Sequence, residues 1–198
     1  MISNRNLSIL FLITGSVGIS FSGLIMRNIN IADPWQIAFF RALAFIFPIT
    51  LILFHRHGLG IVTNIKKTGY LGMVGGFFLM LAHLLFIQAI AHTSIANALF
   101  TLNLVPFITA ILAFLFLKEK ISLRTILIMF FAFVGIFIMV KDGLGTGGFY
   151  GNILALVCAF SFSTFVIILR KSRNIDMMPV NLISGVLVLI VSFVISLG

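Results

Sequence analysis

The longest uninterrupted apolar stretch of the chain runs from 70 to 117 and contains no Asp, Glu, Lys or Arg. A helix that crosses a membrane needs about 20 apolar residues, so this stretch is too long for one crossing and long enough for two. A run of three polar residues at 92–94 lies near the middle, and the charged triplet at 118–120 follows the stretch. The pattern predicts two spanning helices joined by a very short turn.

Apolar runs long enough for one membrane-spanning helix recur along the chain between charged flanks. They are unbroken, whereas the strands of a membrane barrel would alternate apolar and polar residues over about ten residues. The first run is longer than the apolar core of a signal peptide, so we interpret it as a mature helix. A longer polar connection is predicted at 55–69. The predicted spans are 7–26, 35–54, 70–91, 95–117, 121–140, 149–169 and 180–197.

Composition excludes a soluble domain, because 61% of the residues are hydrophobic and only 9% are charged. A soluble fold could not bury that much apolar surface. The net charge of +9 would suggest nucleic acid in a soluble protein, but the basic residues fall between the apolar runs, so no nucleic-acid partner is predicted. Cys158 is the single cysteine, and no disulfide, metal site or cofactor is expected. The predicted fold class is an all-α polytopic membrane protein.

The Lys and Arg residues support the predicted spans. If the spans alternate in direction, ten of the 13 lie on one side and only Arg27 and Lys141 on the other, with Arg41 inside a span. Short cytoplasmic loops retain an excess of positive charge. We therefore expect a multi-pass protein of the bacterial cytoplasmic (inner) membrane with its N-terminus in the cytoplasm.

Two parts of the sequence resemble each other. The segments beginning at Ile19 and Phe160 share Ser-Phe-Ser late in a helix, then a basic residue, then a proline (Pro34 and Pro179) that opens the next helix. Five spans separate the copies, so the second enters the membrane from the opposite side, an arrangement typical of secondary transporters. The predicted units are a five-helix repeat at 1–142, a glycine-rich linker at 143–148 and the start of a second repeat at 149–198.

The central run also resembles a known family. FIQAIAHTSIANALFTLNLVPFITAILAFLFLKEKIS followed by GIFIMV is similar to the signature of the drug/metabolite transporter superfamily in its EamA-like branch. The shared features are the short hairpin with small and hydroxyl residues, Pro106 within a helix, Glu119 at a helix end and Gly135. The resemblance extends to FFRAL in the second span and to GNILALVCAFSFSTFVIILRK.

The resemblance implies ten helices in two inverted five-helix repeats around a central cavity, with small metabolites, often amino acids, as cargo. This sequence ends in its seventh span. It therefore corresponds either to part of a ten-helix protein or to a chain that pairs with a homodimeric copy or with a partner supplying the missing half. The lipid bilayer and a small-molecule metabolite are the other expected partners.

Arg41 is the strongest candidate site residue, because a charge inside a membrane span is costly and often functional. It could contact an anionic group of the cargo, or it could reach the interface or tie a neighbouring helix. Ser20, Gln88, Asn97 and Thr101 are predicted at a similar depth. Together with Arg41 they would bind a carboxylate; alternatively, they make only interhelical hydrogen bonds, worth about 0.6 kcal/mol each.

His83 is the remaining cavity candidate and lies on one helical stripe with Gly72 and Gly76. This placement favours a packed histidine, and a proton relay is the alternative. In the fourth span, Pro106 is expected to kink the helix, with Asn103 beside it to satisfy freed backbone groups. The kink would serve as a hinge or simply fit a curved bundle.

Glu119 lies between two lysines and is expected to organise the cytoplasmic turn through ion pairs.

The function that fits these features is a secondary transporter, exporter or importer, of small metabolites such as amino acids, working by alternating access. No phosphate-binding loop is present. A non-transporting or truncated membrane subunit is the alternative. An integral membrane transferase fits less well, because the carboxylates are single and scattered.

Overall fold

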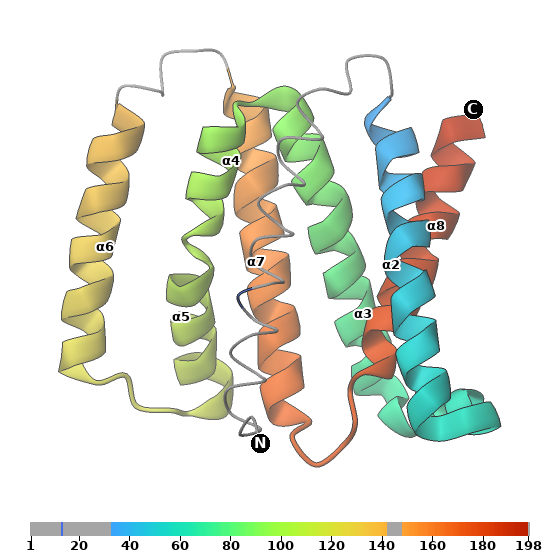
Figure 1. The fold of residues 1–198 in the computed structure, drawn as a ribbon. Coiled ribbons are helices and arrows are strands. Elements are labelled where there is room, and N and C mark those ends of the chain that lie inside the picture. The colour runs from blue at the N-terminus through green and yellow to red at the C-terminus, as the bar shows by residue number, and fades with distance from the viewer. Residues whose placement is uncertain (1–12, 14–32, 142–147, 198) are drawn as a thin grey trace. The chain divides into compact units, whose positions relative to one another are not determined.

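The computed structural model describes residues 13, 33–141 and 148–197, which are helical over most of their length and include no strand (Figure 1). The elements are α2 (Pro34–His57), η1 (Gly58–Gly60), α3 (Ile61–His92), α4 (Ile95–Leu102), α5 (Val105–Leu117), α6 (Leu123–Lys141), α7 (Phe149–Lys171) and α8 (Pro179–Leu197). They occupy the positions of six predicted spans, with α4 and α5 sharing one. The first predicted span, 7–26, lies outside the described residues.

Five stretches of the described chain are long and apolar enough to cross a membrane: α2, α3, α4 with α5, α7 and α8. Their length and composition make the chain an all-helical, polytopic membrane protein. The five-helix repeats and the total of seven spans stay predictions.

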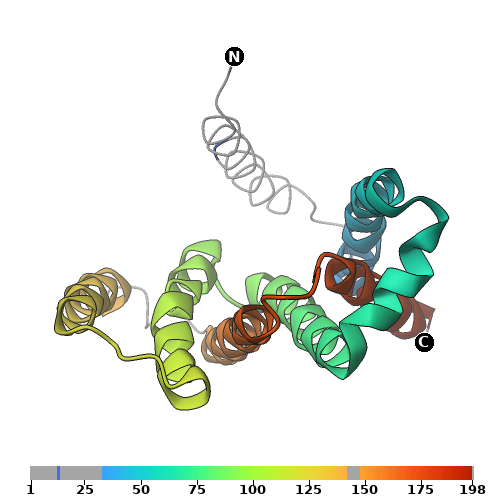
Figure 2. The same cartoon turned by 90° about the horizontal axis from the view of Figure 1, so that it is seen from below.

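Helix α3 is the centre of the packing. It lies between α7 and α8, while α2 packs on α8 and α5 packs on α7 (Figure 2). Small residues allow the close approach: Gly75 and Gly76 of α3 are buried, as are Ala155 and Ala159 of α7. Lipid supplies no hydrophobic force between helices, so close packing of small residues is a main source of their association.

Two glycines of α3 have different close neighbours. A Cβ at Gly76 would lie 2.7 Å from Cγ2 of Ile183, so this glycine permits the α3–α8 contact. The atoms nearest to a Cβ at Gly72 would be those of the Thr68 side chain, one turn earlier on the same helix.

The segment 55–69 differs from the predicted polar connection. Helix α2 continues to His57, and helical structure resumes at Ile61 after a single 3-10 turn. Gly69 then interrupts α3 with a φ of 58°, a left-handed conformation that glycine adopts without steric cost. The long apolar part of α3 therefore begins at Tyr70, where the hydropathy pattern had placed it.

The predicted short turn is present between α3, which ends at His92, and α4, which begins at Ile95. Ser94 caps α4, because its hydroxyl accepts a hydrogen bond from the backbone N–H of Asn97 at 3.1 Å. Serine is a preferred residue at this position. The hydroxyl of Ser94 therefore has a structural role, which is to cap α4.

The fourth predicted span is divided at Asn103 and Leu104, and Pro106 is the second residue of α5. Proline cannot donate the backbone bond that would continue α4. On the α7 side, the Ser163 hydroxyl donates to the Val105 carbonyl at 3.1 Å. Asn103 contributes through its backbone N–H, which is shared between the carbonyls of Leu99 and Phe100. A hinge at this break stays a prediction.

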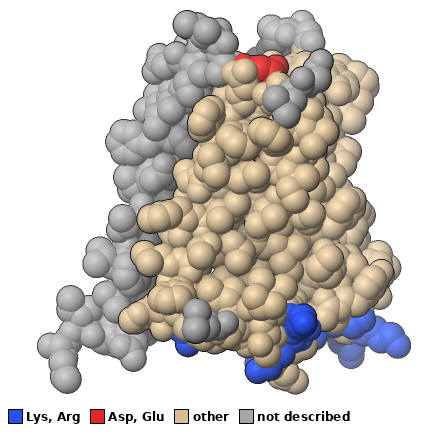
Figure 3. Space-filling model, turned by 90° about the vertical axis from the view of Figure 1, so that its right-hand side faces the viewer, with Lys and Arg blue, Asp and Glu red and all other residues tan. Residues whose placement is uncertain are grey.

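The connections at one end of the helices carry most of the positive charge, and we call this end the basic end. Figure 3 shows Lys and Arg side chains gathered there on one face. The residues are Arg56, Lys66, Lys67, Lys118, Lys120, Arg124, Arg170, Lys171 and Arg173.

Candidate functional site

Arg41 extends sideways from α2 to α3. Its guanidinium lies over the ring of Phe86, 5.3 Å from the ring centroid, within the range of a cation–π contact. At about 1.5 Å per residue, Arg41 is roughly 10 Å from the start of α2 and Phe86 roughly 9 Å from the end of α3. The start of α2 and the end of α3 both lie on the side of the molecule opposite the basic end (Figure 1). Arg41 therefore holds its charge at its own depth and does not snorkel to the interface.

His83 lies one turn deeper on α3 and faces two other helices. Its ring is perpendicular to that of Phe45 in α2, with centroids 5.2 Å apart. On α8, the Ser184 hydroxyl lies 3.5 Å from Nδ1, which is long for a hydrogen bond. Arg41 also interacts electrostatically with His83. We call Arg41, Phe45, His83, Phe86 and Ser184 the Arg41 cluster.

Helix α7 contacts the backbone of α3 next to His83. Cys158 is buried, and its thiol donates to the Ala82 carbonyl at 3.1 Å. Ala82 precedes His83, so this bond fixes the backbone that carries the histidine. Cys158 is therefore a packing residue.

The arrangement can bind an anion. A guanidinium offers five N–H donors in a planar fork, and no hydrogen bond or ion pair joins Arg41 to another described residue. The carboxylates of the described residues, Asp33, Glu119 and Asp176, belong to connections or helix ends. The field of Arg41 is therefore not neutralised by an acid within the described spans.

Asn97 and Thr101 bond elsewhere. The Asn97 amide donates to Thr93 at 3.4 Å, and Thr93 donates to Asn152 of α7 at 3.0 Å. The Thr101 hydroxyl donates to the Asn97 carbonyl of its own helix. None of these bonds involves the Arg41 cluster.

Gln88 and Ser20 are the remaining members of the predicted cavity. Gln88 is half-buried on α3, and its backbone carbonyl accepts a hydrogen bond from the His92 ring at 2.8 Å. Ser20 lies outside the described residues. The single cavity joining all six candidates stays a prediction.

Glu119 has an ion-pair partner from a distant part of the chain. Nη1 of Arg170, at the end of α7, lies 3.0 Å from the Glu119 carboxylate. The pair joins the end of α7 to the connection between α5 and α6 at the basic end. Both side chains are about half exposed, and pairs of this kind are worth at most about 1 kcal/mol.

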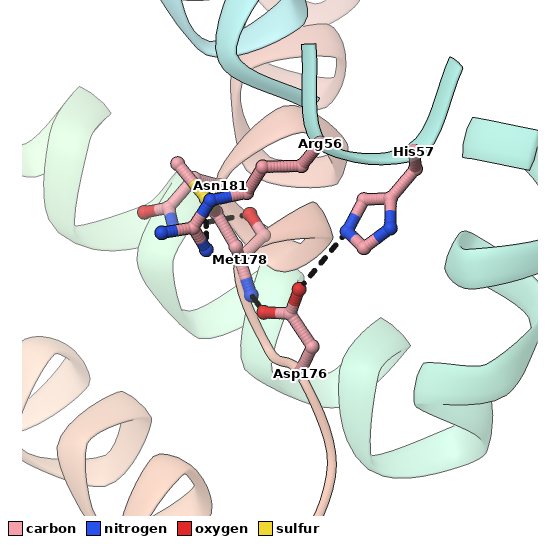
Figure 4. A network of polar contacts seen from close by, with 5 residues as sticks. All are labelled: Arg56, His57, Asp176, Met178 and Asn181. Carbon is pink, nitrogen blue, oxygen red and sulfur yellow. Dashed lines mark hydrogen bonds and ion pairs between the residues drawn. The ribbon is translucent and has the colours of Figure 1, made fainter. Parts of the chain in front are cut away.

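A second polar network joins α2 to the connection between α7 and α8 (Figure 4). The His57 ring nitrogen lies 3.2 Å from the Asp176 carboxylate. Next to this pair, Nη1 of Arg56 lies 3.7 Å from the sulfur of Met178. The Asn181 amide donates to the Met178 carbonyl at 3.2 Å. We call this arrangement the basic-end latch.

The charge of Asp176 is stabilised where it lies. Its pKa is lowered chiefly by the hydrogen bond from the Met178 backbone N–H, and also by His57 and Arg56, against a raising effect of partial burial. A carboxyl with a lowered pKa in the folded state stabilises the fold above its ordinary pKa of 3.8. That stabilisation is lost as the pH falls through the folded-state pKa.

We expect Asp176→Asn to lower the melting temperature at neutral pH by a small amount, corresponding to at most about 1 kcal/mol, because the pair is partly exposed. Below pH 3.8 the difference from the wild type should shrink and disappear, since the wild-type carboxyl is then itself protonated. Melting curves in detergent between pH 7 and pH 2.5 measure this. A difference that persisted unchanged at the lowest pH would contradict the electrostatic role of Asp176.

Several of these residues were not predicted from the sequence. His57 has no acid near it in the sequence, and its partner Asp176 lies 119 positions away. Phe86 is one of 23 phenylalanines. Phe86 lies at about the same depth as Arg41, and this shared depth is the one feature of the sequence that could have singled it out. Among the described residues, no group of three or more His, Cys, Asp or Glu could hold a metal ion.

The described helices and their polar contacts define a multi-pass helical membrane protein with an uncompensated cation inside one span. The model of the EamA-like transporter family matches residues 6–141, more than half of the chain. The chain belongs to that family, whose members are membrane transporters and not enzymes. Comparison with curated proteins and with solved structures finds no match.

Proposed function

We propose that this protein is a secondary transporter of small metabolites in a bacterial cytoplasmic membrane, and that it works by alternating access. Family membership is the observation that carries the proposal. The N-terminus and the basic end would face the cytoplasm, because cytoplasmic loops keep the excess of Lys and Arg.

An inverted repeat of five helices fits the arrangement of α2 and α8. Both open on a proline, they pack side by side, and they run in opposite directions (Figure 1). Transporters with inverted repeats bind cargo at the repeat interface near the membrane centre. The Arg41 cluster, with residues from α2, α3 and α8, would form part of such a site.

The basic-end latch and the Glu119–Arg170 pair suit a gate at the cytoplasmic end. Each joins the end of one helix to the connection between two other elements, and these parts would separate if that end opened. Partly exposed ion pairs are weak, so breaking both would cost only about 2 kcal/mol or less. A transport cycle can overcome that cost easily.

Proteoliposomes containing the full chain test this function. A panel of labelled amino acids and organic acids should include at least one solute whose uptake is saturable and independent of ATP. Protein-free liposomes provide the baseline. If every solute entered at the baseline rate, the result would favour a non-transporting membrane subunit.

A further inference from the structure

We infer that the Arg41 cluster is a binding site for a small organic monoanion, a carboxylate on an apolar or aromatic body. The inference deepens the proposed function and rests on it, since it names the class of cargo. It excludes the zwitterionic amino acids that the family resemblance had suggested as cargo.

The position of the guanidinium gives the first reason. Arg41 lies about two turns inside α2, and its side chain is exposed on the surface of the chain. A charge at that depth is costly in lipid. Contact with one aromatic face offsets a part of that cost. Among the described residues no acceptor meets the N–H donors, and a carboxylate matches their fork with two parallel hydrogen bonds.

The net charge of the cluster gives the second reason. Arg41 lies within α2, about two turns from its start, whereas the other Lys and Arg of the described residues belong to the basic end, apart from Lys141 at the end of α6. One cation neutralises one negative charge, so a dianion would carry an unpaired charge into the membrane, which is costly. The cluster contains no acid that could bind an ammonium, and Arg41 would repel one. A monoanion is therefore favoured over both a dianion and a zwitterion.

The surroundings of Arg41 give the third reason. Phe86 lies under the guanidinium and Phe45 lies against His83, so each of these two polar side chains contacts an aromatic ring. Small-molecule sites are lined mainly by apolar and aromatic side chains together with a few polar groups. The half-buried His83 offers one further polar group, against the ring of Phe45. A ligand with a carboxylate and an apolar body would match both the guanidinium and the aromatic rings.

Equilibrium binding to the full chain in lipid nanodiscs tests the inference. The probes share one aromatic body: N-acetylphenylalanine is the monoanion, its amide is neutral and phenylalanine is the zwitterion. We expect the monoanion to bind at least about tenfold more tightly than the other two, because an unpaired buried charge costs more than 1.4 kcal/mol. Equal affinity of the three probes, or no binding of the monoanion, would overturn the inference.

Substitutions locate the site. Arg41→Gln should weaken binding of N-acetylphenylalanine by at least about tenfold. Arg41→Lys, which keeps the charge and loses the fork, should have an intermediate affinity. Arg124→Gln, an exposed arginine of the basic end that lies outside the latch, is the control and should bind as the wild type does. An Arg41→Gln protein that is folded and binds normally would also overturn the inference.

Binding and flux distinguish this inference from the proposed function. If the wild-type chain carries some solute but does not bind the monoanion, the site is wrong and the transporter stands. If it binds the monoanion and moves no solute, the site stands and the transporter is wrong. The comparison of probes uses the wild-type chain alone, so it remains valid even if a variant fails to fold.

Discussion

Replacing Gly151 with alanine is expected to destabilise the protein strongly. A Cβ at this position would lie 2.7 Å from the His92 carbonyl carbon and 2.7 Å from the Thr93 nitrogen. Both atoms belong to the backbone of the turn between α3 and α4, which cannot move aside as a flexible side chain can. The start of α7 would have to separate from the turn, and the Thr93–Asn152 hydrogen bond would be lost with it.

The expected loss is about 2–3 kcal/mol, at the upper end of the usual cost of overpacking. It would occur although alanine favours a helix by about 1 kcal/mol over glycine. Cys158 is the only cysteine and is buried, so a thiol-reactive dye reports unfolding directly in a melting experiment.

Gly60→Ala is the matched control for this measurement. No atom lies within 4 Å of a Cβ built there, and its φ of −79° suits any residue. Its melting temperature should stay near that of the wild type. Equal melting temperatures of Gly151→Ala and the wild type would contradict the close packing of α7 on the turn.

Cross-linking the basic-end latch is expected to stop transport. With Cys158 replaced by alanine, cysteines at His57 and Asp176 would be joined by a flexible bifunctional thiosulfonate reagent. The link ties α2 to the connection between α7 and α8, where the two side chains now lie 3.2 Å apart. Alternating access requires the cytoplasmic end to open, so flux should fall roughly tenfold or more and recover after reduction.

Cysteines at Ser122 and Thr125 give the control for this experiment. Their side chains lie 2.7 Å apart at the start of α6, so a link between them joins no separate elements. The same reagent should leave the flux of that variant unchanged. Full flux through the cross-linked latch would show that the basic end does not need to open there.

The elements of the fold were more predictable than its contacts. Apolar length and charged flanks were enough to place the turn at 92–94 and the start of the long apolar helix at Tyr70. The break before Pro106 follows from a missing N–H, which is a local property. The helix at 61–68 was not predicted, because its polar residues indicated a loop and its end depends on the left-handed conformation of Gly69.

The site was less predictable, because its contacts join residues that are far apart in the sequence. The sequence singled out Arg41 and His83 through the cost of polar groups in a membrane. It could not select Phe86 among many phenylalanines, nor match His57 with Asp176. Asn97 and Thr101 were predicted from depth alone, but their hydrogen bonds depend on which way each helix faces.

Uptake of labelled solutes into proteoliposomes tests the central claim most directly. The full chain should take up N-acetylphenylalanine faster than protein-free liposomes do, with saturation. Arg41→Gln should reduce that rate, while Arg124→Gln should not. Uptake of another solute alone would refute the assigned cargo class and leave the transporter standing. Rates equal to those of protein-free liposomes for every solute of the panel would contradict the assignment of this protein as a transporter.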